Sequence, residues 1–209
     1  MCKIRFIRDT DIKFIKESLL NYGVFFSDYV DSVISVLLQF NGTLSSTLIT
    51  ENNNDIIGLD INLLQPYTFW NEVYKKLSFF KKIKWTYSNI TSNKQVQLNN
   101  DTENIYTQLY KKDSNIAYTL FYMFKKIPNR TISAADVGIL QLKLIFDTHK
   151  YQTAEIVVAN QASIKSYNTR GFNITTYKEY EKDVMFAVIQ IDEIKDKIKN
   201  HQINCEIIL

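Results

Sequence analysis

Apolar residues recur along the first third of the chain at two spacings, which predict its strands and helices. Basic and apolar residues alternate over Lys3–Arg8, which predicts a strand. Asp9–Asp11 offers a helix cap before Ile12–Tyr22, whose apolar residues recur at helical spacing. A second helix is predicted over Ser27–Phe40, whose apolar residues form one stripe. The chain therefore begins with one strand followed by two helices.

The next apolar runs predict an antiparallel hairpin. Thr43–Thr50 and Ile56–Leu63 are apolar runs on either side of Asn52–Asp55, a cluster of turn-forming residues. Residues 65 to 114 then interrupt the compact pattern. Phe69–Lys84 predicts a helix, Asn89–Asn100 a polar loop and Asp101–Lys112 a short helix. We expect one domain, residues 1–209, with a helical insertion at about 65–114 between the third and fourth strands.

The remaining pattern predicts a parallel pair of strands joined by a helix. Ile116–Phe124 is nearly continuous in apolar residues, as expected of a strand buried on both faces. The helix Ala134–His149 and the buried strand Ala154–Ala159 follow, so the three form a right-handed βαβ unit. A short helix comes next, and then Phe172–Tyr180 and Val184–Ile191 alternate as an antiparallel pair. This order predicts an α/β fold with a mixed central sheet.

Composition narrows the class of partner. Apolar residues make up 45% and charged residues 22% of the 209 residues, as in an ordinary globular protein. The net charge of +3 is small and dispersed, so we expect no nucleic-acid partner. No apolar run approaches the ~20 residues of a membrane span, so we expect no membrane partner. Cys2 and Cys205 lack the spacing of a disulfide framework and indicate a reducing compartment. We expect a cytoplasmic protein.

No metal site is expected. The chain has no cluster of cysteines and histidines with the spacing of a zinc site. Its two histidines, His149 and His201, stand in no nucleophile or metal arrangement and are interpreted as surface residues.

One stretch resembles the signature of a known enzyme superfamily. After the predicted strand Ala154–Ala159 come Asn160, two residues, the small residue Ser163, Tyr167 four positions further on, and then Gly171-Phe172. This pattern resembles the signature of the GNAT-superfamily N-acetyltransferases. About thirty residues upstream, Arg130–Ala135 resembles the phosphate loop of that superfamily, in which Arg or Gln precedes x-x-Gly-x and then Gly or Ala. The resemblance therefore implies the GNAT type of mixed sheet.

The resemblance also implies acetyl-CoA as the acetyl donor, without a metal. Backbone N–H groups at a helix N-terminus bind phosphate well. Ser133 stands where the superfamily has glycine; with a negative φ the loop keeps its function, whereas a positive φ would strain it. The residues implied to bind the cofactor are Phe124, Lys125, Arg130, Thr131, Ser133, Ala134, Ala135 and Asn160.

Tyr167 is the catalytic residue that the resemblance implies. In the superfamily a tyrosine here stands by the thioester sulfur as general acid, and a phenol of pKa ~10 helps a thiolate to leave. The alternative is a core tyrosine with a packing role. Backbone N–H groups near Phe124 would polarise the acetyl carbonyl. The general base is not identified: Asp28, Asp31 and Glu51 border acceptor sites in this superfamily, and each also fits a surface charge.

The implied function is transfer of an acetyl group to a primary amine, most simply that of a small molecule. The insertion and the segment Gly171–Tyr180 carry a weaker resemblance to arylalkylamine N-acetyltransferases of the invertebrate type. The alternative is a non-catalytic GNAT-fold protein used for binding or as a scaffold, which the serine at position 133 and the missing base favour. The sequence leaves the acceptor and the oligomeric state open.

Overall fold

One eight-stranded mixed sheet runs through the computed structural model, which describes residues 2–21, 27–84, 111–125, 132–147, 152–158, 161–179 and 182–209. The strand order is β6-β7-β5-β4-β3-β2-β1-β8. The strands are β1 (Cys2–Phe6), β2 (Ser45–Asn52), β3 (Asp55–Leu63), β4 (Ile116–Phe124), β5 (Gln152–Val158), β6 (Asn173–Glu179), β7 (Lys182–Gln190) and β8 (Glu206–Ile208). Two neighbouring pairs, β4 with β5 and β1 with β8, are parallel. The predicted α/β class with a mixed sheet is confirmed.

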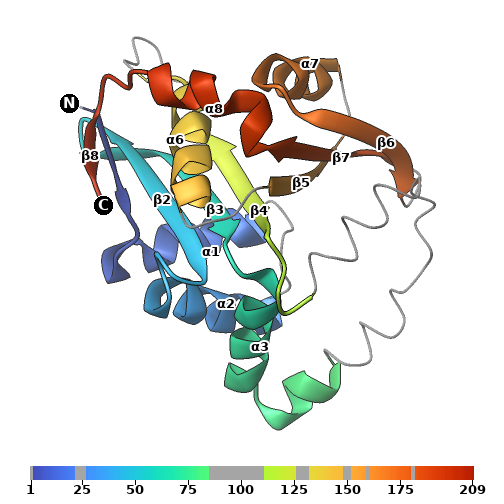
Figure 1. The fold of residues 1–209 in the computed structure, drawn as a ribbon. Coiled ribbons are helices and arrows are strands. Elements are labelled where there is room, and N and C mark those ends of the chain that lie inside the picture. Colours follow the sequence, from blue (N-terminus) through green and yellow to red (C-terminus); the bar gives the residue numbers. More distant parts are fainter. Residues whose placement is uncertain are drawn as a thin grey trace.

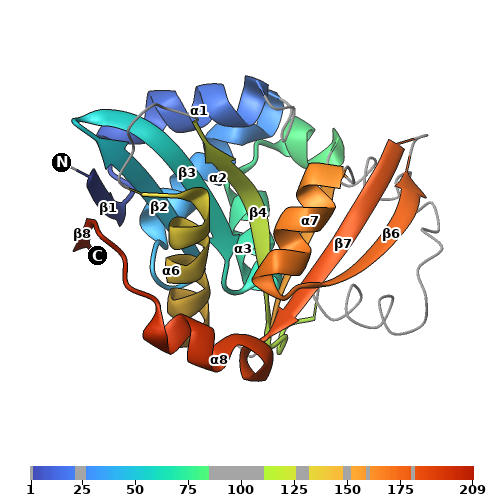
Figure 2. The ribbon, with the colours of Figure 1, turned by 90° about the horizontal axis from the view of Figure 1, so that it is seen from above.

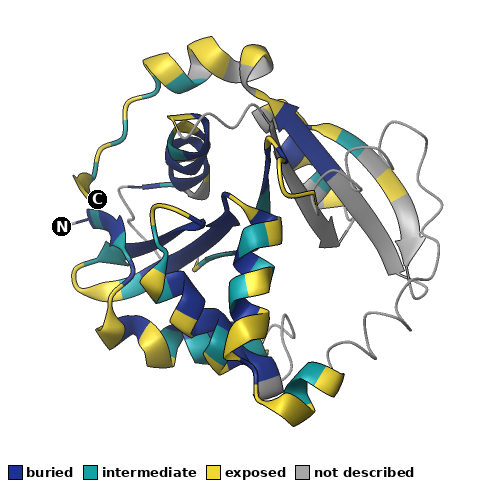
Figure 3. Cartoon of the chain, turned by 60° about the horizontal axis from the view of Figure 1, so that its bottom comes forward, coloured by how far each residue is buried: buried dark blue, intermediate teal, exposed yellow. Residues whose placement is uncertain are grey.

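Helices cover both faces of this sheet (Figure 1). A first group, α1 (Ile12–Asn21), α2 (Ser27–Gln39) and α3 (Pro66–Lys76), packs on one face around a large apolar cluster. A second group, α6 (Ala134–Asp147), α7 (Gln161–Arg170) and α8 (Ile191–Asn200), lies on the other. Figure 3 shows α6 as a largely buried helix beneath the more exposed α8. The sheet is therefore the middle layer of three.

The hairpin β2–β3 has the turn that its sequence predicts. Asn53 and Asn54 both have positive φ, 53° and 70°, and asparagine tolerates this left-handed conformation better than most residues. Residues Asn52 and Asp55 pair across the base of the turn. Turn chemistry therefore determines this register, as the sequence indicates.

The helix predicted over Phe69–Lys84 is wrong as a single helix. Helix α3 ends at Lys76, where Leu77 takes an extended conformation with ψ 143°. A new helical segment covers residues 79–84, and the Lys82 N–H donates to the Ser78 carbonyl at 2.9 Å. Serine commonly begins helices, and a buried Leu77 anchors the break. The apolar spacing continues across this interruption, so the sequence pattern predicts one helix where the structure has two.

The C-terminal segment was not predicted. It adds an edge strand to the sheet, next to β1. Strand β8 runs parallel to β1, with Ile4 opposite Ile207. Cys2 and Cys205 form a disulfide beside this pairing. Their separation of 203 residues hides the contact from any argument based on spacing. The two cysteines are therefore not free thiols, and they no longer indicate a reducing compartment. The cytoplasmic location stays a prediction.

The segments Asn89–Asn100 and 101–110 lie outside the described residues. The single domain and the insertion at about 65–114 therefore stay predictions. None of the helices in the described ranges is long and apolar enough to cross a bilayer.

Candidate active site

Strands β4 and β5 form a fork. They pair in parallel from Ile116 opposite Gln152 to Thr119 opposite Glu155, where their shared register ends. Beyond this point β4 continues to Phe124 beside β3, and β5 continues to Val158 beside β7. Figure 2 shows β4 and the β6–β7 hairpin diverging like the arms of a V. Where two neighbouring strands of a sheet separate, backbone N–H and C=O groups that would otherwise pair with each other become available to a ligand.

A β-bulge lies where the fork begins. Asn62 of β3 pairs with Thr119, and the neighbouring Ile61 pairs with Phe121, so that Leu120 is an extra residue in β4. A bulge bends its strand and increases the local twist. The bend therefore starts at the same residue, Thr119, at which β4 and β5 separate.

The burial of β4 differs from the prediction of a strand buried on both faces. Ile116 and Ala117 are buried, and after them only Phe121 is, whereas the other residues to Phe124 are partly exposed. A continuous apolar run is typical of a strand that is buried on both faces. The second half of β4 instead lies along the fork, where β5 no longer pairs with it. This position explains why its apolar residues are partly exposed.

The start of α6 is stabilised by its own side chains. The Asp136 carboxylate accepts hydrogen bonds from the Ser133 backbone N–H at 2.6 Å and the Ser133 hydroxyl at 2.7 Å. The Asp136 N–H donates in turn to Ser133 Oγ at 3.2 Å. Among the described residues, positive φ outside glycine occurs only at Asn53 and Asn54. Ser133 therefore does not have the positive φ that would strain a serine in a phosphate loop.

Asp136 also contacts the C-terminal segment. Its Oδ1 lies 2.7 Å from Nε2 of His201, which follows α8. Burial raises the pKa of Asp136, but hydrogen bonds from the side chain and backbone of Ser133 and from His201 lower it to below its ordinary value. The carboxylate is therefore charged at neutral pH. Within the described ranges, no three His, Cys, Asp or Glu side chains form a group suited to a metal ion.

Five of the residues predicted to bind the cofactor are described, and they lie at two places in the fold. Phe124 and Lys125 end β4, and the Lys125 ammonium donates to the Ile56 carbonyl at 3.0 Å and lies 5.3 Å from the centre of the Phe14 ring. Ser133, Ala134 and Ala135 stand at the start of α6. Arg130, Thr131 and Asn160 lie outside the described residues.

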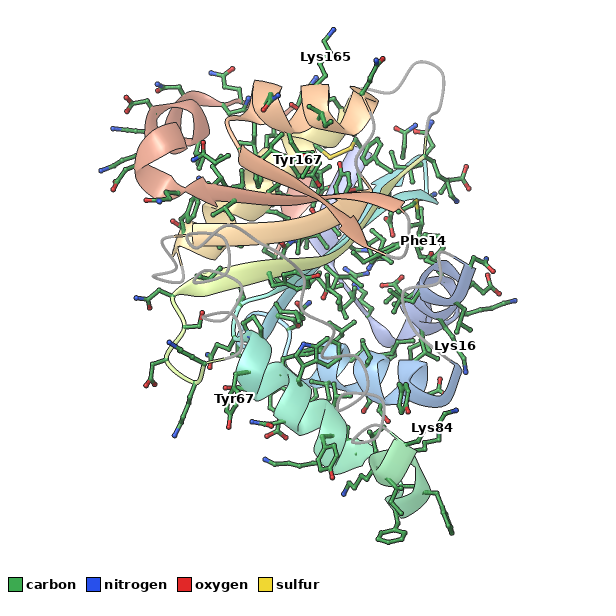
Figure 4. The ribbon with its side chains drawn as sticks, turned by 90° about the vertical axis from the view of Figure 1, so that its right-hand side faces the viewer. Phe14, Lys16, Tyr67, Lys84, Lys165 and Tyr167 are labelled. Carbon is green, nitrogen blue, oxygen red and sulfur yellow. A yellow bond between two sulfur atoms is a disulfide. The ribbon has the colours of Figure 1, made fainter. Side chains whose placement is uncertain are left out.

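Tyr167 is a buried residue of α7. Its ring meets that of Phe172 edge to face, with centroids 5.1 Å apart, and it belongs to a cluster with Ala117 and Leu142. Figure 4 shows Tyr167 on the sheet side of α7 and Lys165 pointing away from it. The packing role considered for Tyr167 is therefore real, and a catalytic role would be in addition to it.

Two of the three acidic residues considered as general bases form ion pairs with basic side chains. The exposed Asp31 pairs with Lys16 at 2.7 Å. Glu51 pairs with Arg5 at 2.5 Å. The side chain of Asp28 is not described.

The acidic residue Glu155 is not among the residues that the sequence predicts for the site. This residue lies in β5 opposite Thr119, at the last register position before the fork opens. It is the one acidic residue of β5, and it stands five positions before Asn160.

Solved structures of acetyltransferases share this fold. The ribosomal-protein-S18-alanine N-acetyltransferase from Escherichia coli superposes with a TM-score of 0.52 at 12% identity, covering 91% of this chain and 94% of that chain. An aminoglycoside acetyltransferase in complex with coenzyme A gives 0.52 at 11% identity, covering 94% and 98%. YncA, a putative acetyltransferase from Salmonella typhimurium with its cofactor acetyl-CoA, gives 0.51 at 15% identity, covering 92% and 95%.

No model of a known protein family matches the sequence, and neither does any curated protein. The likeness to these solved structures is one of fold, since their identities to this chain lie between 11% and 15%. The chain therefore has the fold of the GNAT-superfamily N-acetyltransferases.

Proposed function

We propose that this chain is an N-acetyltransferase that transfers the acetyl group of acetyl-CoA to the primary amine of a small molecule. The observation that carries the proposal is the fork: β4 and β5 separate after Thr119 and Glu155, and the chain leaving β4 leads to the N-terminus of α6. A helix N-terminus favours anions, and the donor carries a diphosphate. Two of the solved structures with this fold contain coenzyme A or acetyl-CoA, which supports the proposal.

The described residues fit such a donor. Ser133 does not have a positive φ, so a serine in this loop causes no left-handed backbone strain. We propose that Ala134 and Ala135 of the first turn, with Lys125 at the end of β4, contact its phosphates, and that the sequence-predicted Arg130, Thr131 and Asn160 complete the site. When bound, the donor supplies an acetyl group activated as a thioester.

We propose Tyr167 as the acid of this reaction. A primary amine is protonated in solution and must lose a proton before its electron pair can form the carbon–nitrogen bond. A base at the fork would accept that proton directly or through water. As the carbon–sulfur bond breaks, Tyr167 would donate its hydroxyl proton to the sulfur. After the carbon–nitrogen bond forms, the nitrogen loses its second surplus proton, which restores the Tyr167 hydroxyl, and the products are an amide, a free thiol and one proton released to solvent.

A non-catalytic binding protein is the second candidate, and one observation favours it. The Ser133 backbone N–H, which a phosphate loop would offer to its ligand, already donates to Asp136. The two candidates differ in turnover: both bind a cofactor or partner at the fork, and only the enzyme releases free thiol from acetyl-CoA.

Calorimetry with acetyl-CoA tests the proposal before any acceptor is known. We expect saturable binding and a rise in melting temperature at millimolar acetyl-CoA. Arg130→Ala should weaken binding by about 1.5–3 kcal/mol because a charge-assisted phosphate contact is lost. Lys76→Ala, an exposed lysine of α3, is the matched control and should bind as the wild type does. No binding by the wild type would contradict the proposal, and binding without thiol release across a panel of amines would favour the second candidate.

A further inference from the structure

A chain of buried side-chain hydrogen bonds starts at the fork. The Thr119 hydroxyl donates to Asn62 Oδ1 at 2.6 Å, and the Asn62 amide donates to Asp60 Oδ1 at 2.7 Å. Asn62 and Asp60 are 2% and 3% exposed. Thr119 is both the last β4 residue in register with β5 and the residue before the bulge at Leu120. The first hydrogen bond therefore spans the point where β4 bends.

The same network reaches α6. The Gln141 amide donates to the Ser46 carbonyl at 3.1 Å and to the Asp60 carbonyl at 3.4 Å, and Gln141 Oε1 accepts from the Ser46 hydroxyl at 2.8 Å. Gln141 is 2% exposed. Helix α6, whose first turn belongs to the proposed phosphate site, is thus tied to the strands that carry the bulge. A cavity of about 20 Å³, roughly the size of one water molecule, lies beside Asn62, Thr119 and Gln141.

Stability alone does not explain this network. Burying polar groups is costly, and apolar side chains of the same shape would serve a core equally well or better. What a fully connected polar network adds is directional: each bond fixes one donor against one acceptor, so that a single arrangement is preferred. Here the arrangement fixed is the path of β4 where it leaves β5.

We infer that Thr119, held by Asn62, is a positioning residue that determines where β4 bends and so where its backbone meets the acetyl group of the donor. The inference rests on the proposed function. Thr119 acts through the backbone of the bulge and takes no part in proton transfer. Displacement of reacting groups by about 1 Å can reduce a rate about 100-fold, so small shifts of the bulge have large effects.

Thr119→Val tests the inference because it keeps the shape of the side chain and removes only the hydroxyl. We expect kcat/KM for acetyl transfer to fall roughly 10- to 100-fold, mostly in kcat. Thr119→Ser restores the hydroxyl and should recover most of the loss. Thr47→Val is the matched control, because the Thr47 hydroxyl is also buried, in β2, and makes no hydrogen bond within the described residues. It should turn over like the wild type.

Asn62→Ala breaks the same hydrogen bond from the other side and serves if Thr119→Val does not fold. Unfolding by denaturant is measured for every variant, since a purely structural network would lower stability and leave kcat unchanged. Wild-type rates in folded Thr119→Val or Asn62→Ala would overturn the inference, as would failure of Thr119→Ser to recover activity. If instead the wild type neither binds acetyl-CoA nor releases thiol, the proposed function itself fails, which is a separate result.

Discussion

Gly58 lies directly opposite Phe124 in the β3–β4 pair, and a Cβ atom on Gly58 would stand 3.0 Å from Phe124 Cδ2. The same Cβ would stand 3.0 Å from the Cβ of Thr50 on β2, which is fixed to the backbone. The glycine therefore leaves the space into which the last ring of β4 fits. Phe124 is one of the residues predicted to contact the cofactor, so this close approach lies beside the proposed site.

Gly58→Ala should destabilise the protein by about 1–3 kcal/mol, because overpacking forces its neighbours to move. We also expect weaker acetyl-CoA binding, since Phe124 must shift. Gly42→Ala is the comparison: Gly42 has φ 83° and open space around its Cβ position, so alanine there costs backbone strain without crowding. Denaturant unfolding and calorimetry measure both effects. Equal acetyl-CoA affinities in the two variants would mean that Phe124 does not contact the ligand.

Tyr167→Phe separates leaving-group chemistry from packing. The ring that packs on Phe172 is retained, so stability should change little. If the hydroxyl protonates the sulfur, the acetyl-transfer rate should fall roughly 10²–10⁴-fold, while acetyl-CoA affinity barely changes. Single-turnover kinetics with an accepted amine measures the rate. Full activity of the phenylalanine variant would leave Tyr167 with its packing role alone.

The ion pair of Arg5 and Asp11 should make stability depend on acid pH. Arg5 donates to both carboxylate oxygens of Asp11, at 2.7 and 2.9 Å. Burial raises the pKa of Asp11, but hydrogen bonds from Arg5 and from the Arg8 N–H lower it to below its ordinary 3.8. A lowered folded-state pKa adds stability above pH 3.8, and this is lost as the pH falls through the lowered value.

Asp11→Ala should therefore cost about 3–5 kcal/mol at pH 7, towards the lower end because Glu51 still pairs with Arg5. The difference from the wild type should shrink as the pH falls below 3.8. Urea unfolding between pH 7 and pH 3 measures it. A difference that stays constant over this range would show that Asp11 stabilises the fold in a way independent of its charge.

Reduction of the Cys2–Cys205 bond should lower the melting temperature. The bond closes a loop across a separation of 203 residues, and removing such a constraint from the unfolded chain costs typically 2–5 kcal/mol. Melting with and without dithiothreitol measures the effect, and Cys205→Ser should melt like the reduced wild type and ignore the reductant. Two titratable thiols in the untreated wild type would contradict the pairing.

Local pattern was enough to predict the strands β1 to β7, but neither β8 nor the contacts between the elements. The bounds of β4 follow from its apolar run, and the β2–β3 turn follows from its asparagines, because both depend on neighbours in sequence. Helix α8 was missed although Ile191, Ile194 and Ile198 have helical spacing, since the many charges around them hide the stripe. The sequence also contains the signal for the cap of α6, because Ser133 with Asp136 three positions later is a capping pattern.

The determinants of the site are long-range, and no local pattern encodes them. Thr119 and Asn62 are 57 positions apart and meet only because the β3–β4 register brings them together. His201 and Asp136 are 65 positions apart and meet only through the path of α8. Polar residues in strands are compatible with many partners, so a sequence alone cannot select these.

The position of β8 at the edge of the sheet, beside the disulfide, has a mechanical consequence. Residues 2 and 205 are joined covalently, and β8 lies along β1 beside that bond (Figure 1). A stretching force applied to the two ends of the chain would therefore be carried by one sulfur–sulfur bond and a three-residue strand. The fork, the bulge and α6 all lie within the covalent ring and would remain unloaded. While the disulfide is intact, tension at the two ends of the chain is thus not transmitted to the fork between β4 and β5.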